Sequence, residues 1–270
     1  MTSPKLARSA GPLTTGIWVR VAAVAAAVVW GVFYFGVIDL LVVPIQDTQF
    51  DSFYLVETGW GLLYTVLVAL PLVLFALRPR VVFLQQVATV ALAVLACAVI
   101  TPAWGQVVTG VLLLLTALLL SWWAGQPSWP VGSLRDRRLD RWLGALVVVA
   151  AAGAVWYAAE MIQQARSGRP DDDTWGLMHL PMQAAFGLAL AGSAAVTWLA
   201  AGSGRTPAAG WRVSAVPAAL SACWLGVVSL MYPDHLGSLG DAGGVAAIAW
   251  GLLFGVAAVT RGRETVDPGR

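Results

Sequence analysis

Charged residues are scarce in this chain of 270 residues. Only 11% of the side chains are charged, 16 of them basic and 14 acidic, whereas a soluble domain carries about 25% charged residues. Hydrophobic residues make up 59% of the chain, and the mean hydropathy is +0.77. This composition argues against a soluble domain and indicates a protein whose main partner is the lipid bilayer.

Cysteine and histidine are almost absent. The two cysteines, Cys97 and Cys223, lie inside apolar segments, and neither has a cysteine or histidine at metal-ligand spacing. They imply no disulfide framework, and packing is the simpler interpretation of both. The two histidines, His179 and His235, lie at the edges of apolar segments. That position excludes a haem held by two histidines at mid-depth.

The chain also lacks the short motifs of several enzyme classes. It has no Walker-type Gly-x-x-x-x-Gly-Lys loop, no Gly-x-Ser-x-Gly elbow and no His-Glu-x-x-His pair. It therefore carries no haem, nucleotide or flavin signature. No Asp, Glu, Lys, Arg or His occurs in the middle third of the apolar runs. This absence argues against a charged relay across the bilayer, which ion pumps usually need.

Long apolar runs dominate what remains. About 20 apolar residues are needed to cross the hydrocarbon core, and the backbone must be helical there because lipid offers it no hydrogen-bond partner. We predict an all-α integral membrane protein with eight transmembrane helices. The first run is longer than the core of a signal peptide, so we expect no cleavage. The eight runs lie at 18–43, 59–77, 81–101, 105–123, 142–163, 180–201, 212–232 and 243–260.

The basic residues predict the orientation of the helices. If the N-terminus is cytoplasmic, only Arg166 and Arg169 fall on the outer side. Such an imbalance is typical of the positive-inside rule, so both termini are predicted in the cytoplasm and the protein in the plasma (inner) membrane. The clusters are short and lie at helix ends, so no nucleic-acid partner is expected. The 14 inner basic residues are Lys5, Arg8, Arg20, Arg78, Arg80, Arg135, Arg137, Arg138, Arg141, Arg205, Arg212, Arg261, Arg263 and Arg270.

The two halves of the chain share an order of landmarks. Each places an acid near the outer end of its first run, Asp39 and Glu160, and the segment 57–64 resembles the segment 172–179. We predict a four-plus-four parallel repeat with its axis along the membrane normal. Similar composition of apolar helices is the alternative explanation. The predicted segments are a cytoplasmic tail 1–17, a repeat 18–123, a basic cytoplasmic linker 124–141, a repeat 142–260 and a cytoplasmic tail 261–270.

The repeat points to a candidate site at the outer end of the second half. In the alignment, His179 replaces Tyr64 and Gln183 replaces Val68. Carboxylates at membrane depth are costly, by about 2.5–3.5 kcal/mol at the centre, and demand partners. We therefore expect a polar outer vestibule for a substrate. Its candidate residues are Asp39, Glu160, Trp175, His179, Gln183, Asp234 and His235.

The spacing of Trp175, His179 and Gln183 predicts one helical face if the helix begins before Pro181. If Pro181 instead opens the helix as its first residue, residues 173–180 would form a separate interfacial turn.

A divalent metal is a weaker expectation. Carboxylate and imidazole ligands suit zinc or manganese, and His179 and His235 are the candidate ligands. A capped turn explains Asp234 and His235 equally well. Glu57 and Asp241 are further outer carboxylates around the candidate residues. The loop acids are most simply solvated residues, namely Asp47, Asp51, Asp171, Asp172 and Asp173.

Three functions remain open. The first, which we favour, is a permease or a lipid- or small-molecule-handling protein. Helix breaks would be supplied by prolines, namely Pro71, Pro181 and Pro217. The second is an outer-leaflet enzyme, in which Glu160 or Asp39 is a general base and His179 or a metal is the electrophile. The third is a noncatalytic subunit that binds a membrane protein through outer loop 44–58, with its aromatic residues Phe50, Phe53 and Tyr54.

Overall fold

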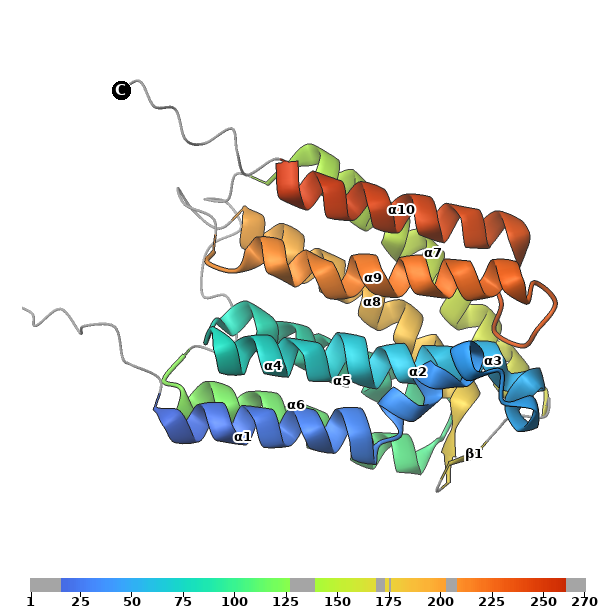
Figure 1. Ribbon diagram of the computed structural model, residues 1–270, viewed down its shortest axis with the longest axis horizontal. Helices are drawn as coiled ribbons and strands as arrows, with labels where there is room; N and C mark the ends of the chain where they lie inside the picture. Colours follow the sequence, from blue (N-terminus) through green and yellow to red (C-terminus); the bar gives the residue numbers. More distant parts are fainter. Residues whose placement is uncertain (1–15, 127–138, 169–172, 175, 203–207, 261–270) are drawn as a thin grey trace, which may run out of the picture.

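The computed structural model describes most of the chain. The described residues are 16–126, 139–168, 173–174, 176–202 and 208–260 (Figure 1). Residues 1–15 of the predicted N-terminal tail, the predicted tail 261–270, residues 127–138 of the predicted linker and the candidate residue Trp175 lie outside them.

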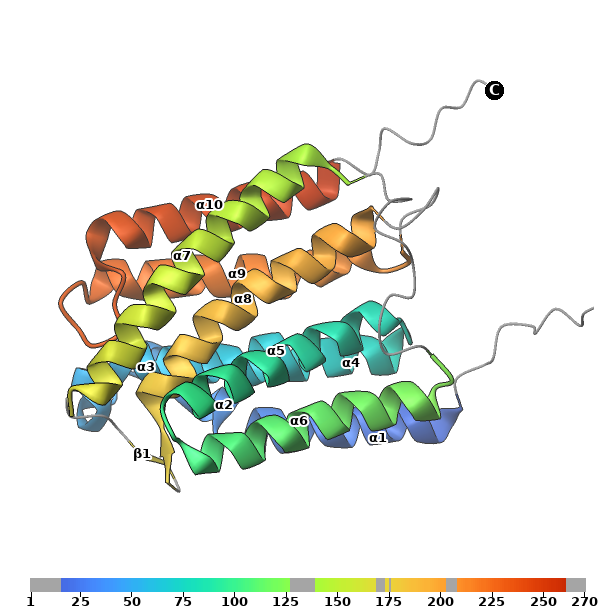
Figure 2. The same ribbon diagram turned by 180° about the vertical axis from the view of Figure 1, so that it is seen from behind.

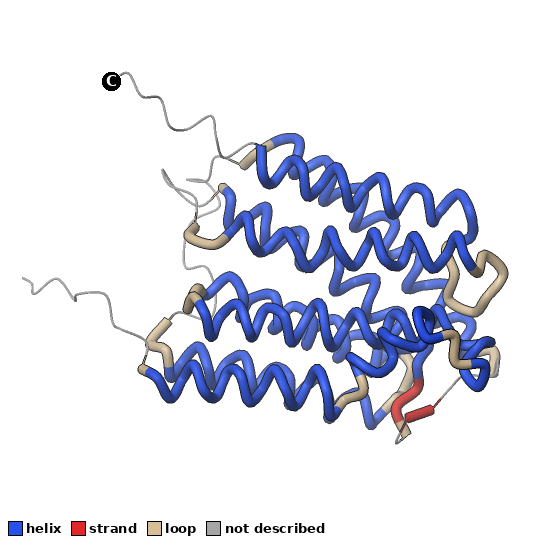
Figure 3. Tube along the Cα trace, viewed as in Figure 1, coloured by secondary structure: helices blue, strands red, loops and turns tan. Residues whose placement is uncertain are grey.

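The regular secondary structure of the described residues is helical apart from one short antiparallel ladder (Figure 3). In this ladder, β1 (Asp173–Thr174) pairs with β2 (Leu177–Met178). Seven helices are long and apolar enough to cross a membrane, and an eighth candidate is a bent pair. The prediction of an all-α fold with several apolar helices is thus confirmed. Six helices are uninterrupted: α5 (Val81–Ile100), α6 (Trp104–Trp123), α7 (Arg141–Arg166), α8 (His179–Ala201), α9 (Trp211–Met231) and α10 (Gly240–Thr260).

The first predicted run is broken. It consists of α1 (Ile17–Val28), the π-helix η1 (Val29–Phe33) and α2 (Gly36–Ile45), with a bend of 45° before α2. Phe35, at the bend, has a φ of 61°, which a residue with a side chain rarely adopts. One continuous helix over 18–43 was therefore the wrong prediction.

The predicted proline breaks do not coincide with this bend. Pro217 lies inside the continuous helix α9, and Pro181 lies in the first turn of α8. Pro71 opens α4 (Leu70–Leu77) directly after the π-helix η3 (Leu62–Ala69). A proline cannot donate the backbone hydrogen bond of a regular helix, and a wider turn before it accommodates this loss.

The second span begins eleven residues earlier than predicted, at Thr48 instead of position 59. Its first turns are the 3-10 helix η2 (Thr48–Phe53) and α3 (Tyr54–Gly61). Every residue of α3 is buried. The predicted docking loop 44–58 is therefore helical over most of its length, and Tyr54, only 2% exposed, is not available to a partner protein.

The helices form a bundle with α5 and α8 in contact near its middle (Figures 1 and 2). Neighbours in sequence pair closely, α5 with α6, α7 with α8 and α9 with α10. The described chain ends, at Ile17 and Thr260, lie at one end of the bundle. At the other end lie α2, α3 and the ladder (Figure 1).

Glycine permits the close approach of the broken helix to the second span. A Cβ atom added to Gly61 would lie 2.5 Å from the backbone nitrogen of Leu40, and one added to Gly36 would lie 2.8 Å from Cβ of Tyr64. Small residues allow such contact between membrane helices. These two glycines hold α2 against α3, and α2 carries Asp39.

Substitution of Gly61 tests this contact. We expect Gly61→Ala to lower the unfolding free energy by about 1–3 kcal/mol, because the backbone of α2 must move away. The measurement is the thermal midpoint of the purified protein in detergent. The matched control is Gly153→Ala on α7, where an added Cβ has no neighbour within 4 Å. The control should keep or raise the midpoint, and an unchanged midpoint for Gly61→Ala would contradict the close contact.

Candidate functional site

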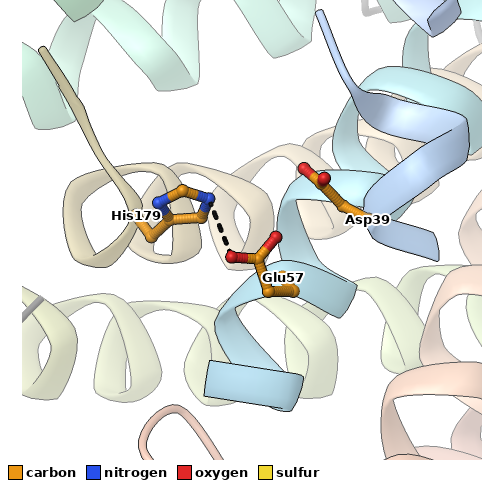
Figure 4. Close-up of side chains that lie close together, drawn as sticks. All are labelled: Asp39, Glu57 and His179. Carbon is orange, nitrogen blue, oxygen red and sulfur yellow. Dashed lines mark ion pairs between the residues drawn. The ribbon is translucent and has the colours of Figure 1, made fainter. Parts of the chain in front are cut away.

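Three ionisable side chains meet inside the end of the bundle that lies opposite the chain ends. Asp39 comes from α2, Glu57 from α3 and His179 from α8 (Figure 4). One ligand atom from each residue lies within 4.8 Å of the other two, and Nε2 of His179 is 3.5 Å from Oε1 of Glu57. The side chains are buried, with Asp39 6%, Glu57 3% and His179 0% exposed. We call them the Asp–Glu–His cluster.

Two helix N-termini border this cluster. Asp39 lies in the first turn of α2, directly after the bend, and His179 is the first residue of α8. The unpaired N–H groups at a helix start carry a partial positive charge, which favours nearby carboxylates. The bend at Phe35 therefore supplies both the position of Asp39 and part of its electrostatic compensation.

Trp60 fixes the plane of the imidazole. Its ring lies 4.5 Å from that of His179, centroid to centroid. Its indole Nε1 donates a hydrogen bond of 2.7 Å to the carbonyl oxygen of Tyr34, which belongs to the break in the first span. Tyr64 packs against both Trp60 and Tyr34, with centroid distances of 5.3 Å each. This aromatic group joins the break, the second span and His179.

A hydrogen-bonded chain of neutral groups starts one helical turn after His179. Nε2 of Gln183 donates to the hydroxyl of Tyr157, which donates to the carbonyl oxygen of Gly237. The Gln183 side chain is fully buried and lies against Gly59, where a Cβ atom would collide with it. Gly59 is two residues from Glu57, so this chain links the surroundings of the cluster to the segment between α9 and α10.

Tyr157 also borders a separate apolar groove. The groove lies between α7, α8, α9 and α10 and has a volume of about 230 Å³. Its lining includes Gly187, Leu190, Leu225 and Trp250. Tyr157 therefore has an apolar groove beside its ring and polar partners at its hydroxyl.

The structure brings together some of the residues that the sequence singled out. Asp39 and His179 belong to the cluster, and Gln183 lies one turn from His179. Glu160 does not join them: it is half-buried on α7, and its Oε1 accepts a hydrogen bond of 2.7 Å from Nε2 of Gln164. Among the described residues, Glu160 therefore lies outside the group of ligand atoms that contains His179.

The second histidine occupies a different environment. His235 is half-buried and packs against Tyr232 and Tyr54, at centroid distances of 5.0 and 6.5 Å. Its neighbour Asp234 is exposed. Among the described residues, the group able to hold a metal contains His179 and not His235. The sequence named both histidines as candidate ligands, and His179 is the one that belongs to such a group within the described part of the chain.

The start of α8 answers where the helix that contains Pro181 begins, for which the sequence left two possibilities. The helix begins at His179, with Pro181 in its first turn, and residues 173–174 and 177–178 form the ladder. His179 and Gln183 share a helical face, but that face does not extend back to position 175.

Glu57 is a site residue that is absent from the candidate set derived from the sequence. It was placed only among the outer carboxylates around that set, because the apolar run was taken to begin at residue 59. A pattern in the surrounding segment could have identified Glu57 as part of a helix. Phe50, Tyr54, Glu57 and Gly61 follow each other at three- and four-residue spacing. That spacing is typical of one helical face.

Comparison with known protein families, curated proteins and solved structures finds no match to this chain. The function is therefore argued from the site itself.

The chain through Tyr157 gives a second prediction. Tyr157→Phe removes the hydroxyl that joins Gln183 to Gly237, so we expect the unfolding free energy to fall by about 1–2 kcal/mol. Unfolding in detergent measures it. The control is Tyr34→Phe, whose half-buried hydroxyl makes only a long contact of 3.5 Å with Oγ1 of Thr109. Equal losses in both variants would mean that the Tyr157 hydroxyl has no special structural role.

Proposed function

We propose that the protein is a multi-pass permease of the plasma membrane, whose Asp–Glu–His cluster is a cation-exchanging site near the extracytoplasmic side. The observation that carries this proposal is the burial of two carboxylates and one imidazole together at a broken helix. The proposal includes a small molecule as the transported substrate of the same site, because it does not name the substrate.

The charge of the cluster supports a site that takes up cations. No lysine or arginine occurs between Arg20 and Arg78, or between Arg169 and Arg205. The segments that carry the cluster therefore bring no permanent positive charge of their own. Buried carboxylates are costly unless they are neutralised. Protons or a bound cation can supply that neutralisation, and both can exchange with water when the site opens.

The broken helix supports movement at this site. In many transporters, interrupted helices form the binding site near the interface of two repeats. Here the bend before α2 lies opposite η3, a π-helical stretch of eight residues. π-Helical turns occur frequently at functional sites. Interrupted backbone on both sides gives this region fewer regular hydrogen bonds to break during a conformational change.

The distribution of basic residues supports the proposed orientation. Arg78, Arg80 and Arg212 lie at the ends of helices on the side where Ile17 and Thr260 also lie (Figure 1). The positive-inside rule assigns that side to the cytoplasm. The Asp–Glu–His cluster then lies toward the extracytoplasmic side.

The order of helix contacts supports the proposed repeat. In each half, the first span packs against the second and the third against the fourth. The third span of each half, α5 or α9, also contacts the second span of the other half. The local match of 57–64 with 172–179 is weaker, because the first segment is helical whereas the second contains the ladder.

A second candidate function is lipid handling, which the apolar groove favours. The groove lies among helices that would be surrounded by lipid chains, and its lining suits a hydrocarbon chain.

The substitution Gly153→Leu would fill the groove from α7, and crosslinking of the protein by a photoreactive lipid should then decrease. The comparison is Ala152→Leu, an exposed residue outside the groove lining. Equal crosslinking in both variants would remove this candidate.

A flux experiment tests the permease. The full-length protein is reconstituted in vesicles that contain a pH-sensitive dye, and gradients of different cations are imposed. We expect wild-type vesicles to show cation-driven proton movement. Glu57→Gln, which removes a carboxylate at nearly constant shape, should reduce it to the level of protein-free vesicles.

The control for this experiment is Asp51→Asn, which removes an exposed carboxylate at the start of the same span. It should keep the wild-type flux. Thermal unfolding of each variant checks that it is folded. Absence of proton movement in wild-type vesicles under every gradient would contradict the proposal.

A further inference from the structure

We propose that Asp39, Glu57 and His179 bind one divalent transition-metal ion of the zinc or manganese class. The inference deepens the proposed function and rests on it, since the ion would be the cation that the cluster exchanges for protons. It names the chemical class of that cation and the three side chains that hold it.

The ligand set defines the class of ion. Two carboxylates and one imidazole form a mixed oxygen and nitrogen set, which suits zinc and manganese better than magnesium or calcium. Calcium and magnesium sites are built almost entirely from oxygen ligands. Cys97 and Cys223 lie outside the group, so no thiolate shifts the preference toward softer ions.

The distances are close to those of a metal site. Ligand atoms lie about 2 Å from zinc, so two of them lie at most about 4 Å apart. Nε2 of His179 and Oε1 of Glu57, at 3.5 Å, already meet this condition. The largest separation in the group, up to 4.8 Å, would need a shift on the order of 1 Å. A change of side-chain rotamer supplies such a shift.

Charge balance favours a bound cation. With both carboxylates ionised and the imidazole neutral, one divalent ion makes the cluster neutral. Metal ligands must be deprotonated, so binding of the ion displaces the protons that these side chains carry. The helix N-termini at Asp39 and His179 reduce the cost of the carboxylates but supply only partial charges.

Two buried polar atoms near the cluster have no hydrogen-bond partner within the described part of the chain. They are Oε1 of Gln183, which lies against Gly59, and Oγ1 of Thr58, next to Glu57 in the sequence. A buried polar atom without a partner is costly. Water carried by a bound ion would offer Oγ1 of Thr58 such a partner.

The titratable groups near the cluster do not supply the positive charge that the proposed ion would supply. The elements packed against the cluster bring the phenols of Tyr34, Tyr64 and Tyr157. They are neutral near pH 7 in water. Glu160 on α7 is bonded to Gln164, and Arg212 begins α9 at the opposite end of the bundle. The three proposed ligands therefore account for the charge of the cluster.

Calorimetric titration of the full-length protein with zinc chloride tests the site. After treatment with a chelator, wild type should bind one zinc ion per chain. Repeating the titration in buffers with different ionisation enthalpies should show that zinc binding releases protons. Glu57→Gln and Asp39→Asn should each weaken binding by on the order of 100-fold or more, which exceeds the usual effect of outer-shell changes.

The matched control is the other histidine of the chain. His235→Gln should bind zinc as wild type does, whereas His179→Gln should not. X-ray absorption of the wild-type zinc complex gives a readout that needs no variant. It should show one imidazole in a shell of nitrogen and oxygen atoms. Sulfur in that shell, no imidazole, or equal loss of binding in both histidine variants would overturn the site.

The results separate this inference from the permease proposal. If zinc does not bind but Glu57→Gln still abolishes proton movement, the metal site is wrong and the permease stands. If zinc binds with the expected ligands but no gradient drives flux, the metal site stands and the permease is wrong.

Discussion

The cost of placing two carboxylates inside an apolar bundle governs the arrangement at one end of this protein. Asp39 and Glu57 are almost fully buried, and only His179 joins them as an ionisable partner in the described group. Two devices reduce the cost: the imidazole and the starts of two helices. The bend before α2 is needed for the second of them, because it creates one of the helix starts and places Asp39 there.

The same bend organises the neighbouring packing. It exposes the carbonyl oxygen of Tyr34 to the indole of Trp60, and Trp60 in turn orients the ring of His179. Gly36 and Gly61 let the two segments approach without a side chain between them. A region that breaks regular helix geometry is thus held by aromatic contacts and hydrogen bonds that cross between spans.

Sequence patterns predicted the helices well because hydrophobicity and length suffice for them. The starts of α5, α6, α7 and α9 fall within a residue of the predicted positions. The bend at Phe35 could not be predicted, since it depends on packing against a distant span. The site could be predicted only in part from the sequence. The positions of Asp39 and His179 within or beside apolar segments indicated these two residues. Glu57 could be placed only with the knowledge that its span begins at Thr48. Glu160 resembled Asp39 by position, yet α7 presents it to Gln164.

Tyr157 links the apolar groove to the surroundings of the Asp–Glu–His cluster. Its ring borders the groove, and its hydroxyl holds Gln183 one turn from His179. Any molecule in the groove that displaces this ring also alters the support of Gln183. If both places bind ligands, as proposed above, coupling between them is reciprocal. A lipid in the groove would then change the cation affinity of the cluster by the same factor as the cation changes the affinity for the lipid.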